Sequence, residues 1–347
     1  MTEVMSESRV PPAPPRPAVS VIAPMLNEAS YIDHLVSDLA EQDIEEPFET
    51  IIADGGSTDG SVELLRAAAE QAGLDLLILD NPDRYQSHGL NRCIRAASGD
   101  VIVRLDCHTR YPADYVRRCV DSVRETGAAN VAGVFTAIGR TPTERAVACA
   151  LESPFGGHNW TRNATAGERV EVDTNYLGAF RKDALERVGM YDEDLIIGEV
   201  EDLNLTLRDA GETILLDPEI RSYYYPRGSY LALFRQYYRY GYWKVAVMDK
   251  HRRIISGRSV VPCVFVLSLV GLGLASVESR WARRLLAAEA VAYSAGAVGF
   301  GFAAARKCES MPLLPRVMAA FATFHVAHGS GMVHGAVDKL LSRHAAS

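Results

Sequence analysis

The last third of this 347-residue chain contains three long apolar runs, which constrain the fold more than any other feature. Residues 259–276 include no charged side chain, and residues 285–305 and 313–337 include one each. Each run is about long enough to cross the ~30 Å hydrocarbon core of a bilayer as a helix. The pattern predicts up to three membrane helices within residues 259–337; buried core helices are the alternative.

The segment before these runs is rich in basic residues. Residues 227–258 contain eight Lys or Arg side chains and a single acidic one, Asp249. Basic residues collect on the cytoplasmic side of membrane helices. We therefore expect the preceding part of the chain to lie on the cytoplasmic face of the inner (plasma) membrane.

Composition excludes several other classes of protein. The formal net charge of −8 gives no general attraction to nucleic acid. Six cysteines without a CxxC pair argue against a zinc ribbon and a disulfide framework, and favour a reducing compartment. Residues 1–18 are rich in proline and lack the apolar stretch of a secretory signal, so they are predicted to be a disordered tail.

Residues 19–105 alternate short apolar stretches with segments of helical spacing. The predicted strands cover residues 19–23, 49–53, 76–79 and 101–105, and the predicted helices cover 30–41, a segment beginning near Ser61 after a capping Asp59, and 87–97. Such alternation is typical of a mainly parallel, doubly wound α/β sheet. Ligands of such sheets bind beyond the carboxyl ends of the strands.

Polar motifs follow three of these strands directly. They are Pro24-Met-Leu-Asn27-Glu28, the turn Asp54-Gly-Gly-Ser-Thr-Asp-Gly60, and Asp106-Cys-His108. Singly, each has a plainer explanation as a helix entry, a turn or a cap. Together, at one sheet edge, they predict a site. The absence of GxGxxG after the first strand and of GxxxxGK[ST] argues against a dinucleotide dehydrogenase and a P-loop enzyme.

These motifs resemble those of inverting family 2 glycosyltransferases of the GT-A fold, particularly membrane-associated enzymes of the succinoglycan and exopolysaccharide type. Downstream segments agree with the resemblance, namely residues 173–181 and 188–192, the acidic motif Glu199-Val-Glu-Asp202, and Gln236-Tyr-Tyr-Arg239. The resemblance implies a GT-A domain with a doubly wound, Rossmann-like mixed sheet over residues 19–225, interfacial amphipathic helices over 226–258, up to three membrane helices over 259–337 and a tail over 338–347.

The resemblance also implies a nucleotide-diphosphate sugar donor, held by Pro24, Asn27, Glu28, Asp54 and Asp106. Asp106 and His108 would hold Mg²⁺ or Mn²⁺, which would stabilise the leaving diphosphate.

Gln236 and Arg239 lie three residues apart, on one helical face, and are assigned to the diphosphate or the acceptor. Their segment is also rich in aromatic and basic side chains. An interfacial membrane helix is therefore the alternative interpretation, and the two roles are compatible.

An inverting transfer needs a carboxylate to accept the proton of the acceptor hydroxyl. Glu201 and Asp202 are ranked about equal for this role, with Glu199 behind them. The family pattern, aligned on Leu203, places Val200 where the base Asp usually stands. Either a neighbouring acid has taken over, or the base has been lost; acids favoured in a helix's first turn are the plainer explanation.

We predict a membrane-bound glycosyltransferase with a lipid-linked acceptor, a polyprenyl-diphosphate oligosaccharide, that works with polysaccharide assembly partners. One alternative is a synthase that loads a sugar onto a polyprenyl phosphate. Another is a non-catalytic nucleotide-sugar-binding subunit of a polysaccharide assembly complex, which the Val200 departure motivates.

Overall fold

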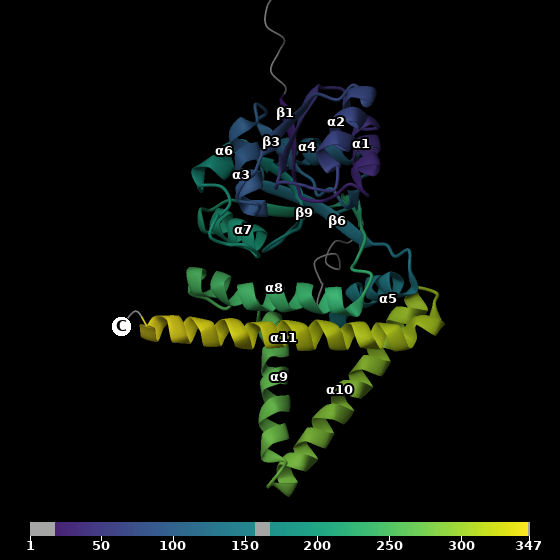
Figure 1. Cartoon of the computed structure of the whole chain (residues 1–347), viewed down its shortest axis with the longest axis vertical. Helices are drawn as coiled ribbons and strands as arrows, with labels where there is room; N and C mark the ends of the chain where they lie inside the picture. Colours follow the sequence, from purple (N-terminus) through teal and green to yellow (C-terminus); the bar gives the residue numbers. More distant parts are fainter. Residues whose placement is uncertain (1–17, 157–166, 346–347) are drawn as a thin grey trace, which may run out of the picture.

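One mixed sheet of nine strands forms the core of the computed structural model, which describes residues 18–156 and 167–345 (Figure 1). Its first half is parallel, in the order β3 (Leu76–Asp80), β2 (Phe48–Asp54), β1 (Val19–Met25) and β4 (Val101–Arg104). Its second half continues with β8 (Gly178–Arg181), β6 (Asn130–Ala137) and β9 (Ile214–Tyr224), and the short strands β5 (Thr109–Arg110) and β7 (Val170–Glu171) pair with β9.

Helices cover both faces of this sheet because alternate strand residues point to opposite sides. Val19 and Val21 pack in one cluster with residues of α1 (Ile32–Ala40), α2 (Ser61–Ala72) and α4 (Tyr115–Thr126). Ile22 packs in a second cluster with residues of α3 (Gln86–Ala96), α6 (Lys182–Arg187) and α7 (Glu199–Asp209). The sheet is therefore doubly wound, as predicted.

The four predicted strands are confirmed, each with ends within two residues of those expected. The carboxylate of Asp59 accepts the amide of Ser61, the first residue of α2, but Gly60 and not Asp59 is the N-cap residue of this helix. The sheet is parallel in its first half and again between β6 and β9, but mixed as a whole. β8 runs antiparallel to both β4 and β6, because the direction of pairing depends on how distant segments meet and not on local periodicity.

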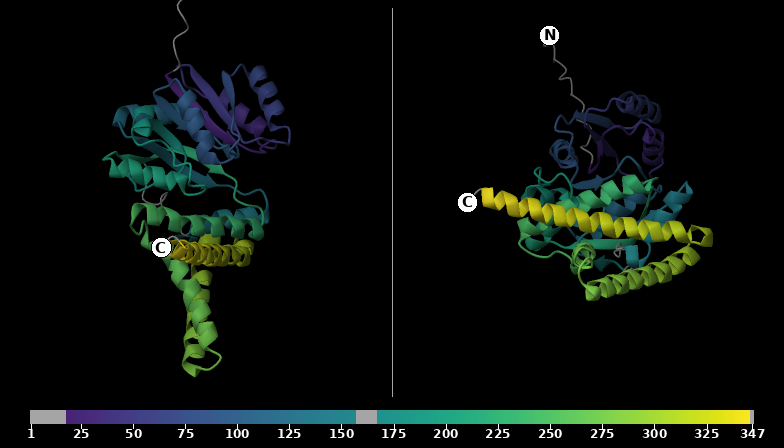
Figure 2. Two further views of the ribbon diagram at one scale, coloured as in Figure 1. Left: turned by 60° about the vertical axis from the view of Figure 1, so that its left-hand side comes forward. Right: turned by 60° about the horizontal axis from the view of Figure 1, so that its bottom comes forward.

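Two long helices lie side by side between the sheet and a helical hairpin (Figures 1 and 2). They are α8 (Tyr230–His251) and α11 (Leu314–Ala345), and α5 (Pro142–Leu151) packs on α11 next to them. The hairpin consists of α9 (Gly257–Ala275) and α10 (Arg280–Lys307) and points away from the sheet. Within the described residues, these two helices are long and apolar enough to cross a membrane.

The third apolar run, residues 313–337, lies mostly in α11, which is not one of these candidate spans. Phe321, Phe324 and Ala327 of this run are buried in a cluster with residues of α5 and α8. Its apolar character is thus explained by packing within the protein. The sequence predicted up to three membrane helices, and the described residues provide two candidates.

Glycines allow α8 and α11 to approach closely. A Cβ atom added to Gly241 of α8 would lie 2.0 Å from the carbonyl oxygen of His328 in α11. Around this contact Tyr237 stacks on Phe324 at 4.4 Å between ring centroids. Several aromatic side chains of α8 therefore face α11, and their abundance does not by itself indicate contact with lipid.

Cys149 of α5 and Cys308, which follows α10, form a disulfide. The sequence argued against a disulfide framework and did not indicate this single pair; the other four cysteines are free. The two residues are 159 positions apart in the chain, and only the tertiary packing of α5 against α10 brings them together.

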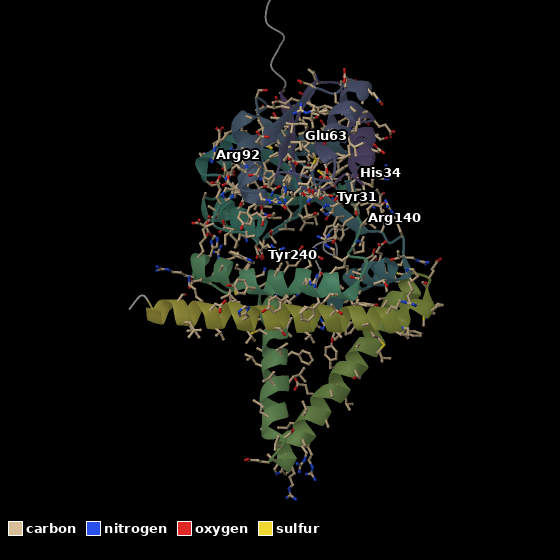
Figure 3. All side chains as sticks on the ribbon, in the orientation of Figure 1. Tyr31, His34, Glu63, Arg92, Arg140 and Tyr240 are labelled. Atoms are coloured by element: carbon tan, nitrogen blue, oxygen red, sulfur yellow. A yellow bond between two sulfur atoms is a disulfide. The ribbon has the colours of Figure 1, made fainter. Side chains whose placement is uncertain are left out.

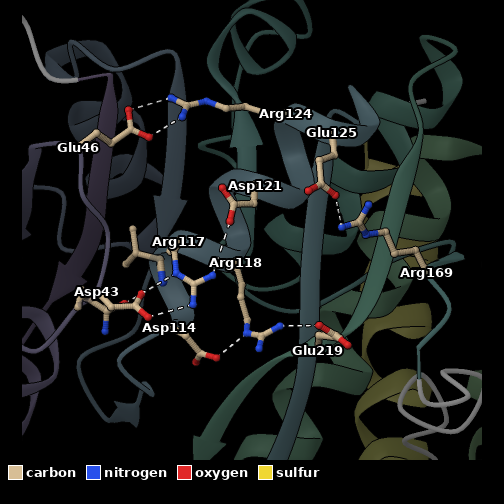
Figure 4. A network of polar contacts seen from close by, with 12 residues as sticks. Asp43, Glu46, Asp114, Arg117, Arg118, Asp121, Arg124, Glu125, Arg169 and Glu219 are labelled. Atoms are coloured by element: carbon tan, nitrogen blue, oxygen red, sulfur yellow. Dashed lines mark hydrogen bonds and ion pairs between the residues drawn. The ribbon is translucent and has the colours of Figure 1, made fainter.

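Ion pairs surround α4 on the surface of the sheet domain (Figure 4). Arg117 pairs with Asp43 at 2.9 Å, and Arg118 pairs with Glu219 at 2.6 Å. Exposed pairs of this kind contribute only about 0–1 kcal/mol each. Their main effect is to orient α4 against neighbouring strands and loops.

Gly241→Ala tests the close contact between α8 and α11. Alanine favours a helix by about 1 kcal/mol, but a methyl group here would overlap the His328 carbonyl and cost roughly 1–3 kcal/mol. We expect the melting temperature in detergent, followed by circular dichroism, to fall by several degrees. Gly271→Ala in α9 is the matched control, because a Cβ at Gly271 meets no atom within 4 Å. Equal melting temperatures for the two variants would contradict the close contact.

Candidate active site

The loops that follow β1 and β2 are joined by hydrogen bonds from side chains to backbone. Asn27 has a φ of 57°, a left-handed conformation that Asn adopts more readily than most residues. Its side-chain Oδ1 accepts a hydrogen bond from the backbone amide of Thr58 at 2.9 Å, and its backbone amide donates to Ser57 Oγ at 2.8 Å. Asp59 Oδ2 accepts the amide of Ala29 at 3.0 Å. The two predicted motifs therefore form one structural unit.

Asp54 shapes the turn after β2. Its Oδ2 accepts the amides of Gly56 at 3.0 Å and Ser57 at 3.1 Å, and its Oδ1 accepts the Ser57 hydroxyl at 2.6 Å. Pro24 lies in β1 and pairs with Ala53 of β2, the residue before Asp54. The structure places Pro24, Asn27 and Asp54 at the expected edge, with the polar groups of Asn27 and Asp54 engaged in holding the loops.

Glu28 and His108 come together from different strand ends. Their side chains approach to 3.4 Å between Glu28 Oε1 and His108 Nδ1. The His108 ring lies near those of Tyr31 and Tyr224, with centroids 6.1 and 6.2 Å away. Burial alone would lower the pKa of His108, but Glu28 and Asp106 raise it above its ordinary value. The Glu28 carboxylate therefore makes His108 more basic, and binding of a metal would require the neutral form of its ring.

Asp106 lies in a buried polar environment just beyond β4. Tyr176 donates a short hydrogen bond to its Oδ2. Its Oδ1 is buried and has no hydrogen-bond partner among the described residues, although Arg104 Nη2 lies 3.6 Å away. A carboxylate oxygen of this kind is a suitable ligand for Mg²⁺ or Mn²⁺.

The protein supplies few ligands for such an ion. Residues 18–156 and 167–345 contain no group of three His, Cys, Asp or Glu side chains arranged to hold a metal. Mg²⁺ often binds through one or two carboxylates, with substrate phosphates and water completing its coordination. Asp106 fits this arrangement, with His108 two residues away as the second predicted ligand.

Glu199 is the acid of α7 that lies closest to Asp106. Its Oε1 accepts a hydrogen bond from Gln86 Nε2 at 3.2 Å and lies 4.0 Å from Arg104 Nη2, the nitrogen that faces Asp106. The Glu199 side chain is 10% exposed. Burial raises its pKa above the ordinary value, while Arg104 opposes this shift. Glu199 therefore has the environment of a carboxylate with enhanced basicity.

Glu201 and Asp202, which the sequence ranked first, bind cations of α8 instead. Lys244 Nζ lies 2.6 Å from Glu201 Oε1. Asp202 is 2% exposed, and Lys250 Nζ and His251 Nε2 each lie 2.8 Å from one of its oxygens. Part of the basic character of residues 227–258 therefore serves to hold α7.

Gln236 and Arg239 of α8, which the sequence assigned to the diphosphate or the acceptor, have different surroundings in the structure. Gln236 donates to the hydroxyl of Tyr240 at 3.0 Å and also hydrogen-bonds Tyr224. Figure 3 shows Tyr240 on the side of α8 that faces the sheet domain. Arg239 is exposed, and no contact connects it to Asp106 or Glu199 among the described residues.

No sequence motif indicated a role for two arginines near the site. Arg227 lies close enough to His108 and Tyr224 for its charge to oppose the rise of their pKa values, which makes it a candidate cation for the diphosphate. Arg104 is buried between Asp106 and Glu199. Its position inside the apolar strand 101–105 could have indicated a buried ion pair, because buried Arg side chains are almost always paired.

Comparisons with known proteins agree with the motifs and the fold. The family model described as Glycosyl transferase family 2 matches residues 20–189. The chain is 34% identical over 261 residues to the Succinoglycan biosynthesis protein ExoA of Rhizobium meliloti (strain 1021), covering 74% of this chain and 78% of that protein.

A more distant relative comes from Methanococcus voltae. It is a dolichyl N-acetyl-alpha-D-glucosaminyl phosphate 3-beta-D-2,3-diacetamido-2,3-dideoxy-beta-D-glucuronosyltransferase, 26% identical to this chain, with 64% of this chain and 71% of that protein covered.

Among solved structures, the fold is similar to that of the mannosyltransferase PcManGT from Pyrobaculum calidifontis, determined in complex with GDP-Man and Mn²⁺. The TM-score is 0.57 at 22% sequence identity, and the match covers 96% of this chain and 92% of that one. This likeness establishes the GT-A fold.

Proposed function

The chain belongs to glycosyl transferase family 2, and from this membership we propose that it transfers a sugar from a nucleotide-diphosphate donor to a lipid-linked saccharide in polysaccharide biosynthesis. The observation that carries the proposal is the position of the candidate site. α7, whose first residue is Glu199, is bound to α8 through Lys244 and Lys250, and the apolar hairpin of α9 and α10 projects away from the sheet beyond α8 and α11 (Figure 1). This arrangement suits a water-soluble donor and an acceptor carried in a membrane.

In this proposal α9 and α10 cross the inner (plasma) membrane, and the domain formed by residues 19–225 works on its cytoplasmic face. α8 and α11 lie along the membrane surface within the segments 226–258 and 313–345. The relatives support the acceptor class, because one is named for succinoglycan biosynthesis and another for transfer to a dolichyl-phosphate-linked sugar. Polysaccharide assembly proteins would be its partners.

The proposed chemistry is a single inverting displacement. An acceptor hydroxyl oxygen attacks the anomeric carbon from the face opposite the diphosphate, so that a new C–O bond forms as the bond to the diphosphate breaks. Glu199 accepts the hydroxyl proton, for which its buried position and raised pKa are suited. Arg227 offers positive charge to the departing nucleoside diphosphate.

A divalent ion held by Asp106 and His108 would supply charge neutralisation of the diphosphate. The unpartnered Oδ1 of Asp106 supports this assignment. Glu28, through its contact with His108, orients the second ligand.

Transfer to a polyprenyl phosphate is the second candidate, and Val200 favours it. A phosphate oxygen is already ionised near neutral pH and needs no base, unlike a sugar hydroxyl. A chain with Val200 at the usual base position could perform this reaction without Glu199. The non-catalytic binding subunit would show no turnover with either acceptor.

The full-length protein in membranes, supplied with a panel of radiolabelled nucleotide sugars, tests the proposal. We expect one donor to label the fraction extracted into organic solvent, where lipid-linked saccharides are recovered. Label in a polyprenyl-phosphate sugar would support the second candidate. Donor binding without any lipid label across the panel would contradict both transfer reactions and favour a binding subunit.

Glu199→Gln tests the base. The amide preserves shape but cannot accept a proton, so turnover with a saccharide acceptor should fall about 10²-fold or more with donor affinity little changed. Because the base must be ionised and its pKa is raised, wild-type kcat should decline on acidification at a pH above the ordinary range of Glu. The residual kcat of Glu199→Gln should not show this decline on acidification.

Glu201→Gln is the matched control, because it changes an acid two residues away that binds Lys244. We expect it to lower the melting temperature and to leave the acid limb of kcat in place. If Glu201→Gln or Asp202→Asn abolished turnover while Glu199→Gln did not, the original ranking from the sequence would be correct.

Asp106→Asn tests the metal. Loss of one carboxylate charge should weaken Mn²⁺-dependent donor binding at least tenfold, measured by calorimetry with the donor identified above. EDTA should abolish wild-type turnover, and added Mg²⁺ or Mn²⁺ should restore it. Full turnover in EDTA would refute the metal assignment and leave the transferase assignment intact.

A further inference from the structure

Arg104 is a buried cation at the centre of the candidate site. It ends β4 and is 1% exposed, which is rare for arginine. Its neighbour in β8 is Gly178, whose φ is 102° and where a Cβ would lie 2.5 Å from the carbonyl oxygen of Val131. The sheet is therefore built without a side chain at the position next to this arginine.

The guanidinium faces three polar side chains from separate parts of the chain. Nη1 donates to the Tyr191 hydroxyl at 3.3 Å, and Nη2 lies 3.6 Å from Asp106 Oδ1 and 4.0 Å from Glu199 Oε1. Burial alone would lower the pKa of Arg104, but Tyr191, Asp106 and Glu199 together raise it, so the side chain stays charged.

We propose that Arg104 is a positioning residue that holds Asp106 of the donor side and Glu199 of the acceptor side against one guanidinium. The proposal rests on the proposed function, since it assigns those two carboxylates to donor and acceptor. Without the arginine, two buried carboxylates would face each other with no countercharge, which is strongly unfavourable. They would turn apart, and Gln86 would be the one described side chain still hydrogen-bonded to Glu199 at the start of α7.

The geometry requires arginine and not only a positive charge. A guanidinium has several N–H donors in a rigid plane, whereas a lysine ammonium is a compact point charge on a flexible stem. Lysine at this position could neutralise one carboxylate, but it could not contact Tyr191 and both acids together. Arg104→Lys should therefore restore only part of what Arg104→Gln loses.

A double-mutant cycle between Arg104→Gln and Glu199→Gln tests the proposal through kcat. Each single variant should lose about 10²-fold or more, and the double variant should lose clearly less than the product of the two losses, because both single variants include the loss of a correctly positioned Glu199 carboxylate. Losses that multiply to about 10⁴-fold would show that Arg104 acts independently of Glu199 and would overturn the proposal.

Hydrogen exchange of the first turn of α7, residues 199–203, gives a readout that does not need turnover. Arg104→Gln should accelerate exchange there at least several-fold, and Arg104→Lys should do so less. Unchanged exchange in Arg104→Gln would overturn the proposal even if activity fell. A wild-type protein with no transferase activity would contradict the proposed function, while the exchange measurement would still decide the role of Arg104.

Two further variants separate positioning from folding. Arg169→Gln removes another arginine from a buried acid, Asp217, outside this cluster, and should leave exchange of residues 199–203 unchanged. Tyr191→Phe keeps the packed ring but removes the hydroxyl that Arg104 contacts, so it remains informative if Arg104→Gln fails to fold. We expect a several-fold loss of kcat in Tyr191→Phe that disappears in the Glu199→Gln background; persistence of this loss would contradict the proposal.

Discussion

The close contact between α8 and α11 determines where the rest of the molecule lies. Gly241 lets the two backbones approach until a single methyl group would not fit, so α8 has little freedom to slide or rotate on its partner. α8 also binds α7, through Lys244 and Lys250. One helix therefore links the acids of α7 to the layer from which the apolar hairpin projects. The proposed use of a membrane-borne acceptor depends on this connection.

Electrostatics at the carboxyl edge of the sheet depends on a small number of buried charges. Asp106 and Glu199 are both removed from water, and Arg104 is the cation between them. Burying charges is costly unless each one has a partner. The chain meets this cost with one arginine for two acids, an arrangement that leaves Asp106 Oδ1 available for a further cation. The same environment keeps Glu199 more basic than an exposed glutamate.

Several motif residues hold loops in addition to any contact with ligand. Asn27 and Asp54 were predicted as nucleotide contacts, and in the structure their oxygens accept backbone amides of the turn after β2. These motif residues thus shape the loops at the edge of the sheet where the candidate site lies. Among the other predicted residues, Glu28 and His108 contact each other, and Asp106 has one carboxylate oxygen without a hydrogen-bond partner in the described part of the chain. Sequence spacing cannot separate these two groups, because both sit in the same short loops.

Local patterns in the sequence determined the strands and helices of residues 19–105, the edge at which polar loops meet, and the family. These features depend on periodicity and on residues close together in the chain, which is what a sequence displays. Tertiary structure alone decided that residues 313–337 pack on α8, that Cys149 meets Cys308, and that Glu199 rather than Glu201 faces Asp106. Each of these depends on contacts between segments far apart in the chain. The orientation of α7 follows from cations that α8 presents to Glu201 and Asp202, and no local pattern within residues 199–202 contains that information.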